Sequence, residues 1–109
     1  MRQERFTEQA QEALAASQQL VLQFHHNQWD VEHVLLALLQ QEAGLVGDIL
    51  REVGVNVEAV KQQVVAVLEK IPKVTYQTTQ IYATPRINAL FTGADAEARR
   101  LKDEFIGTE

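Results

Sequence analysis

The sequence contains no cysteine and no long apolar run. Without cysteine, the chain has no disulfide framework, thiolate metal site or catalytic thiol. Its longest apolar stretch, residues 34–39, is far shorter than the ~20 residues that cross a bilayer. Residues 1–5 also lack the basic-then-apolar order of a signal peptide. We therefore expect a cytoplasmic protein without a membrane partner.

Positive charge is scarce as well: 10 Lys and Arg against 15 Asp and Glu give a formal net charge of -5. Affinity for nucleic acid comes from cationic side chains that displace counterions from phosphates, so nucleic acid is not an expected partner. Arg99, Arg100 and Lys102 form a short basic cluster flanked by acids, which predicts a solvated mixed-charge face. The composition, 46% hydrophobic and 23% charged, is typical of one globular domain.

Catalytic motifs are missing too. Gly44 and Gly47 are too close together for a Walker A loop, and no Lys-Ser or Lys-Thr follows them. Ser17 lies in a helical pattern without the Gly-x-Ser-x-Gly turn of a hydrolase. We therefore predict that the chain is not an enzyme and binds no cofactor of its own.

Three histidines raise the question of a metal site. His25 and His26 are adjacent, so on a helix their side chains would diverge by about 100°. Neither they nor His33 has the His-Glu-x-x-His spacing of a zinc protease. We expect solvated loop histidines and no metal site.

What the sequence does contain is a repeat. Residues 6–33 reappear in the same order of residue classes at 83–109, where Thr7 aligns with Thr84, Leu14 with Phe91 and Glu32 with Glu109. Neither copy can bury its apolar stripe alone, so we predict one all-α domain, a pseudo-twofold helical bundle. Its expected parts are a first repeat at 1–70, a connection at 71–82 and a partial second repeat at 83–109.

Capping signals predict five helices. They are expected from an N-cap at Thr7 to about residue 24, from Asp30 to 40, from 45 to a C-cap at Gly54, from Asn56 to 70, and from Thr84-Pro85 to about 102. Periodicity places four residues of the second helix in the core: Val34, Leu35, Leu38 and Leu39.

Two acids, Glu32 and Glu109, each lie one short connection beyond a helix that starts with a threonine, Thr7 or Thr84. Such an acid-plus-hydroxyl pair can accept hydrogen bonds from a guanidinium or a peptide backbone. The alternative, which spacing alone favours, is that each carboxylate only stabilises its own helix N-terminus, by ~0.3 to 1 kcal/mol.

Several motifs together resemble a known family. They are residues 5–14 (RFTEQAQEAL), 32–39 (EHVLLALL), 49–55 (ILREVGV), 84–87 (TPRI) and 105–109 (FIGTE). This combination resembles the double Clp repeat, the N-terminal domain of Clp-type AAA+ unfoldases, and residues 54–73 are most similar to the ClpB disaggregase branch. A complete domain of this family has eight helices, so we expect the second repeat here to be truncated.

The resemblance implies a module that binds unfolded or aggregated polypeptide, or an adaptor, and delivers it to an ATP-driven threading ring. ATP and Mg would be bound by the AAA+ modules of that ring and not by this chain. The alternative is a free-standing adaptor or regulator that docks on Clp components. The resemblance assigns substrate handling to Thr7, Asp103 and Glu109 and, from ClpC relatives, phosphoarginine recognition to Glu32 and Glu109. With the repeat partner Thr84 and the apolar Phe91, the candidate substrate- or adaptor-binding residues are Thr7, Glu32, Thr84, Phe91, Asp103 and Glu109.

Overall fold

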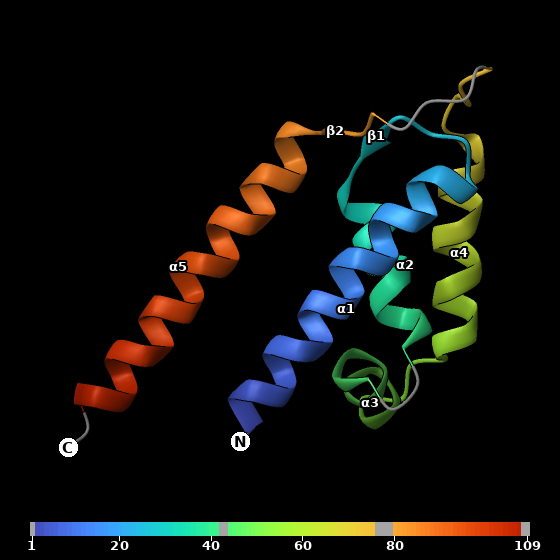
Figure 1. The fold of residues 1–109 in the computed structure, drawn as a ribbon. Coiled ribbons are helices and arrows are strands. Elements are labelled where there is room, and N and C mark those ends of the chain that lie inside the picture. The colour runs from blue at the N-terminus through green and yellow to red at the C-terminus, as the bar shows by residue number, and fades with distance from the viewer. Residues whose placement is uncertain (1, 42–43, 76–79, 108–109) are drawn as a thin grey trace.

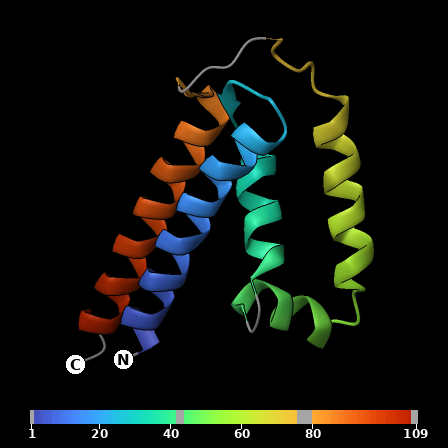
Figure 2. The ribbon, with the colours of Figure 1, turned by 45° about the vertical axis from the view of Figure 1, so that its right-hand side comes forward.

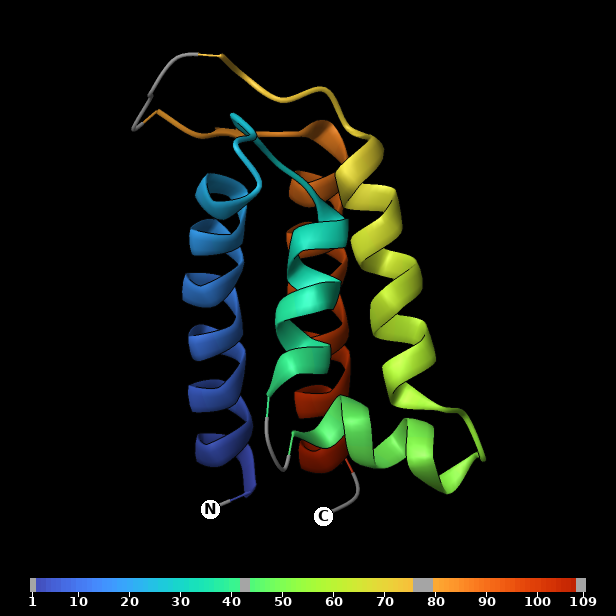
Figure 3. The same ribbon diagram turned by 90° about the vertical axis from the view of Figure 1, so that its right-hand side faces the viewer.

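The computed structural model describes residues 2–41, 44–75 and 80–107, with side chains at 8–41, 44–75, 80–97 and 99–100. The all-α prediction is confirmed: five helices are joined by loops and by one pair of two-residue strands. Figures 1 and 3 show α2 between α1 and α4, with α5 on a further side of α2 and α3 across the lower end. The bundle is therefore centred on α2.

The first helix, α1 (Arg2–Gln23), begins five residues before Thr7. The prediction that Thr7 caps this helix is wrong, because Arg, Gln and Glu at positions 2–5 are good helix formers that continue the helix toward the N-terminus. At the other end, His25 adopts a left-handed φ of 59°. The His26 N–H donates to the Val21 carbonyl at 2.8 Å, which closes the turn.

The second helix, α2 (Val31–Gln40), starts at Asp30 as predicted. The Asp30 carboxylate accepts from the Val31 N–H at 2.7 Å, and the His33 side chain accepts from the Asp30 N–H at 3.1 Å. A histidine thus takes the place that Glu or Gln has in most capping boxes.

The next two helices also follow their capping signals. Helix α3 (Leu45–Glu52) is followed by Gly54 at a φ of +84°, a left-handed conformation that suits glycine. Helix α4 (Val57–Lys70) begins at Asn56, whose side chain accepts from the Ala59 N–H at 3.3 Å. Both boundaries agree with the predictions to within one residue.

The core lies where α1, α2 and α4 meet. Its buried members share an aliphatic or small side chain, and they are Ala13, Leu20, Leu36, Ala37, Leu39, Val64 and Leu68. One prediction was wrong: Leu35 is exposed. Leu38 is half-buried and packs against the core as predicted. Helix α2 has neighbours on several sides, but none of them covers Leu35.

Two short strands that the sequence did not predict join the repeats. Strand β1 (Gln28–Trp29) pairs in parallel with β2 (Tyr82–Ala83), with Trp29 opposite Ala83. The residues that follow them, Asp30 and Thr84, are the caps of α2 and α5. The register therefore sets the N-termini of α2 and α5 side by side.

The last helix, α5 (Pro85–Gly107), starts as predicted, since the Thr84 hydroxyl accepts from the Ile87 N–H at 3.2 Å and proline takes the first helical position. From there α5 runs in the direction of α2 and slants away from α2 and α4 (Figure 1), with the same slant as α1 (Figure 2). Ile87 is fully buried, whereas Leu90 and Ala94 are exposed. The buried anchor of α5 among the described residues is thus in its first turn.

Candidate functional site

Four side chains meet where α2 and α5 begin, and we name Asp30, Glu32, Thr84 and Arg86 the helix-start cluster. The Thr84 hydroxyl donates to Asp30 Oδ1 at 2.9 Å while its oxygen caps α5. Arg86 Nη1 donates to Glu32 Oε2 at 3.2 Å and to Asp30 Oδ2 at 3.4 Å. The two repeats are thus joined by a hydroxyl and a guanidinium from the second and two carboxylates from the first.

Charge explains why these carboxylates are favourable here. Each helix N-terminus carries a partial positive charge, and two of them lie side by side. The Asp30 and Glu32 side chains are only 19% and 20% exposed, so they are partly protected from screening. Arg86 Nη2 lies 2.9 Å from Glu32 Oε1, but that oxygen accepts no well-aligned hydrogen bond from the described residues. Its attraction to the guanidinium is therefore chiefly Coulombic.

An aromatic pair extends the junction along α5. The Trp29 indole N–H donates to Ser17 Oγ on α1 at 2.9 Å, and the Trp29 ring lies 5.3 Å from that of Phe91 on α5 at a tilt of 55°. Ser17 is fully buried and donates in turn to the Leu14 carbonyl at 2.7 Å. Trp29 therefore connects α1 to α5, and Phe91 has a packing partner that the repeat alone did not reveal.

Beyond the cluster, apolar side chains reach solvent. Leu35 lies three residues after Glu32 on α2, and Leu90 lies four residues after Arg86 on α5, so each follows its charged residue on the same helix face. Leu35 is 39% exposed and Leu90 is 40% exposed. We call these two leucines the leucine pair.

Behind the cluster lie two buried histidines, so the expectation of solvated histidines is wrong for His26 and His33 and right only for His25. The His33 ring accepts the Asp30 N–H at Nδ1, so neutral His33 carries its proton on Nε2, which lies 2.9 Å from His26 Nδ1. His26 stacks on Phe24 at 5.7 Å, and its Nε2 has no hydrogen-bond partner among the described residues. A further proton on the pair, at His33 Nδ1 or His26 Nδ1, would break one of these hydrogen bonds.

Burial lowers the pKa of His26 and that of His33, and the neighbouring His26 lowers the pKa of His33 further. For His26, the backbone carbonyls of Leu68 and Ile71 and the Glu69 carboxylate oppose this lowering of the pKa, while Lys73 adds to it. Asp30 and Glu32 oppose the lowering of the His33 pKa. In the unfolded chain both imidazoles titrate near their ordinary pKa of about 6.5. The unfolded state therefore holds more protons than the folded state just below that pH.

We expect the free energy of unfolding to be highest above about pH 6.5 and to fall as the pH drops below it, by up to ~1.4 kcal/mol per pH unit for each histidine. Urea titrations at pH 7.5 and 5.5 would measure this. The matched variant His33→Gln keeps an acceptor for the capping box but cannot titrate, so it should lose about half of the acid dependence. An unchanged dependence in that variant would contradict the assignment.

Of the six candidate site residues, the structure brings Glu32, Thr84 and Phe91 to one junction. Thr7 and Asp103 lie in α1 and α5, but their side chains, like all of Glu109, lie outside the described part of the chain. Their role stays a prediction of the resemblance. The sequence reasoning missed Arg86, whose only signal was a positive charge just after a helix start.

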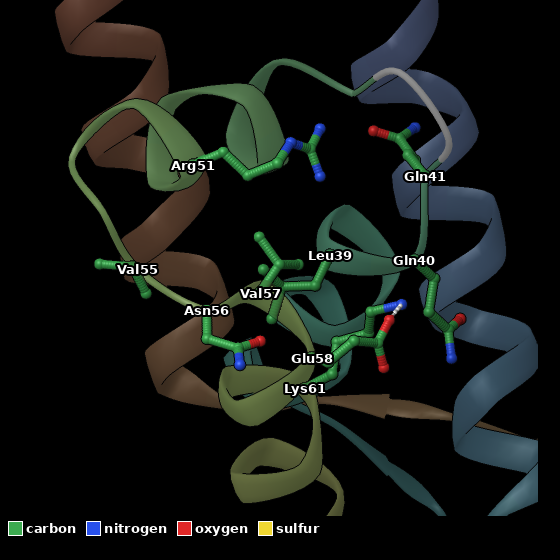
Figure 4. A pocket seen from close by; sticks show the side chains of 9 residues that line it. All are labelled: Leu39, Gln40, Gln41, Arg51, Val55, Asn56, Val57, Glu58 and Lys61. Atoms are coloured by element: carbon green, nitrogen blue, oxygen red, sulfur yellow. Dashed lines mark ion pairs between the residues drawn. The ribbon is translucent and has the colours of Figure 1, made fainter.

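A separate hollow of about 420 Å³ lies at the other end of the bundle, where α2, α3 and α4 meet (Figure 4). Arg51 on its rim pairs with Asp48 at 2.6 Å, and Lys61 pairs with Glu58 at 3.0 Å. Both cations are thus already neutralised. Among the described residues no group of three or more His, Asp or Glu side chains is placed to hold a metal ion.

These observations define an all-helical repeat domain whose surface offers apolar contacts and ion pairs. No helix among the described residues is long and apolar enough to cross a membrane. The chain belongs to the Clp repeat N-terminal domain family, whose model matches residues 5–109. That domain is not a catalytic ATPase module, in agreement with the missing Walker motif.

The proteins that the chain is similar to include ClpB chaperones. The chain is 35% identical to chaperone protein ClpB of Bacillus cereus over 106 residues, which are 94% of this chain and 12% of the relative. It is 38% identical to ClpB of Nitratidesulfovibrio vulgaris over 108 residues, with 96% and 12% covered. For ClpB 1 of Synechocystis sp. the identity is 34% over 105 residues, again with 96% and 12% covered. The chain thus spans about an eighth of the length of these relatives.

Proposed function

We propose that this chain is the client- or adaptor-binding module of a ClpB-like, ATP-dependent disaggregase of the cytoplasm. In this role it engages unfolded or aggregated polypeptide, which AAA+ modules that bind ATP and Mg then thread through a ring. The family membership supports this proposal, as does the similarity to chaperone proteins along almost the whole chain.

The observation that carries the proposal is the leucine pair. Unfolded polypeptides share exposed apolar side chains, and two large aliphatic side chains on neighbouring helices offer them a contact that needs no particular sequence. The contact area is small, so binding is weak, and a module that passes its clients onward must also release them. The helix-start cluster holds the two helices in place without covering the leucines.

The cluster also constrains which contacts are available. Glu32 is already bound to the chain's own guanidinium through Arg86, so a client gains little from this carboxylate while Arg86 stays in place. We therefore propose that apolar contact with Leu35, Leu90 and the exposed part of Phe91 supplies most of the affinity. In this proposal Asp30 and Glu32 fix the relative position of α2 and α5 and contribute little to the attraction of the client.

Amide-shift titration with a reduced and alkylated, permanently unfolded polypeptide tests the proposal. We expect shifts around Leu35 and Leu90, and we expect Leu90→Asn to weaken binding about five- to tenfold because one apolar contact is lost. Val67→Asn removes a similarly exposed side chain from α4 and should leave the affinity unchanged. Equal weakening by both variants, or shifts that avoid α2 and α5, would overturn the site.

A further inference from the structure

The outward face of α3 carries an apolar stripe that the proposed client site does not use. Leu45, Ile49 and Val53 are 46%, 51% and 68% exposed. Leu45 and Ile49 are four residues apart and lie along one side of the helix, and Val53 continues this spacing at the C-cap, just after the last helical residue. On the inward side, Val46 and Leu50 pack against the core. At 100° per residue these side chains form one wide apolar face on α3, and the core covers only the part that carries Val46 and Leu50.

The position of this stripe separates it from the leucine pair. Helix α3 crosses the lower end of the bundle, and the helix-start cluster lies at the upper end (Figures 1 and 3). A further exposed valine, Val55 at 36%, follows two residues after the stripe and lines the hollow shown in Figure 4. Several large apolar side chains exposed within one short segment are typical of an interaction site.

Charge indicates which partner fits. At 100° per residue, Asp48 and Glu52 fall on the same flank of the stripe. Asp48 pairs with Arg51, while Glu52 makes no hydrogen bond or ion pair within the described residues. Two copies of the chain pairing antiparallel through the stripe would bring these acidic flanks together, which is repulsive. A partner with positive charges beside its own apolar residues would instead be attracted by this acidic flank. The net charge of -5 would add to that attraction.

We propose that the outward face of α3 is a docking surface for an amphipathic helix of a partner protein, one whose apolar stripe is bordered by Lys or Arg. The i, i+4, i+8 spacing of Leu45, Ile49 and Val53 matches the apolar stripe of a second helix laid against it. Glu52 then selects the cationic border, because the charge of Asp48 is already balanced by Arg51. This surface acts independently of the client site.

The test uses three designed helical peptides with the same composition of leucines: one bordered by Lys, one bordered by Glu, and one with the stripe scrambled. We expect the Lys-bordered peptide to shift the amides of residues 45–53 and to bind at least tenfold more tightly than the other two. Ile49→Asn should weaken the binding of the Lys-bordered peptide about tenfold. Leu22→Asn, which removes an equally exposed side chain from α1, should not.

Charge reversal provides the second arm. Glu52→Lys should weaken the binding of the Lys-bordered peptide and strengthen the binding of the Glu-bordered one. The fold should stay intact because Glu52 is exposed. Equal binding of the Lys- and Glu-bordered peptides would overturn the proposal. So would a change in the amide shifts of α3 when the protein is diluted without peptide, because that change would indicate self-pairing. Leu90→Asn separates this surface from the client site, because peptide binding at α3 should survive it.

Discussion

Replacing Leu36 with alanine is expected to lower the free energy of unfolding by about 3 kcal/mol. Leu36 is 1% exposed and lies in the core between α1 and α4. Truncation removes buried apolar contacts and leaves a cavity, because the helices on both sides are held by their own packing and cannot close it. Urea denaturation at pH 7.5 would measure the loss as a lower midpoint with an unchanged slope.

The neighbouring leucine provides the control. Leu35 is the preceding residue on α2 but is 39% exposed. Leu35→Ala should therefore lower the free energy of unfolding by less than about 1 kcal/mol. Leu35→Ala should instead weaken the binding of the unfolded polypeptide. Leu36→Ala, measured below its unfolding transition, should leave this binding unchanged. If Leu35→Ala destabilised the fold as much as Leu36→Ala, the division between core and binding face would be wrong.

Asp30→Ala is the second variant with a large expected effect. One carboxylate caps α2, accepts the Thr84 hydroxyl and lies 3.4 Å from Arg86. Loss of the cap costs about 1 kcal/mol, and loss of a hydrogen bond to a charged, half-buried group costs about 1.5 kcal/mol more. We expect a total loss of about 2 to 3 kcal/mol, together with faster amide hydrogen exchange in the first turns of α5.

Asp30→Asn is the matched control, since asparagine also caps a helix but carries no charge. It should recover the cap and lose part of the contact with Thr84 and Arg86, giving a value between wild type and Asp30→Ala. Should Asp30→Ala leave exchange in α5 unchanged, the helix-start cluster would not be what anchors that helix.

Local chemistry was the part of the fold that could be read from the sequence. The caps at Asp30, Asn56 and Thr84 and the left-handed Gly54 were predicted correctly, because each depends on a side chain and the backbone within three residues of it. Thr7 shows where this reasoning fails. A capping residue preceded by good helix formers has no need to end the helix, and position alone does not reveal this.

The site was less predictable, because it depends on residues far apart in the chain. Arg86 meets Glu32 only because two parallel strands place one helix start beside another, and strands of two residues leave no periodic signal. His26 and His33 are likewise seven positions apart, and their burial depends on how α4 and the loop before α2 enclose them. Periodicity located the apolar side of α2 but could not say that Leu35 would lack a neighbour.

The contacts that hold α5 against β1 and α2 lie in its first two turns, at Arg86, Ile87 and Phe91, so the helix can tilt about this end as a pivot. Its 23 residues span about 35 Å at 1.5 Å per residue, so a tilt of about 10° moves the far end by roughly 6 Å. The hydrogen bonds at the pivot would change little during such a swing. Leu90 lies within these two turns, so we expect such a tilt to leave its position relative to Leu35 almost unchanged while the far part of α5 moves.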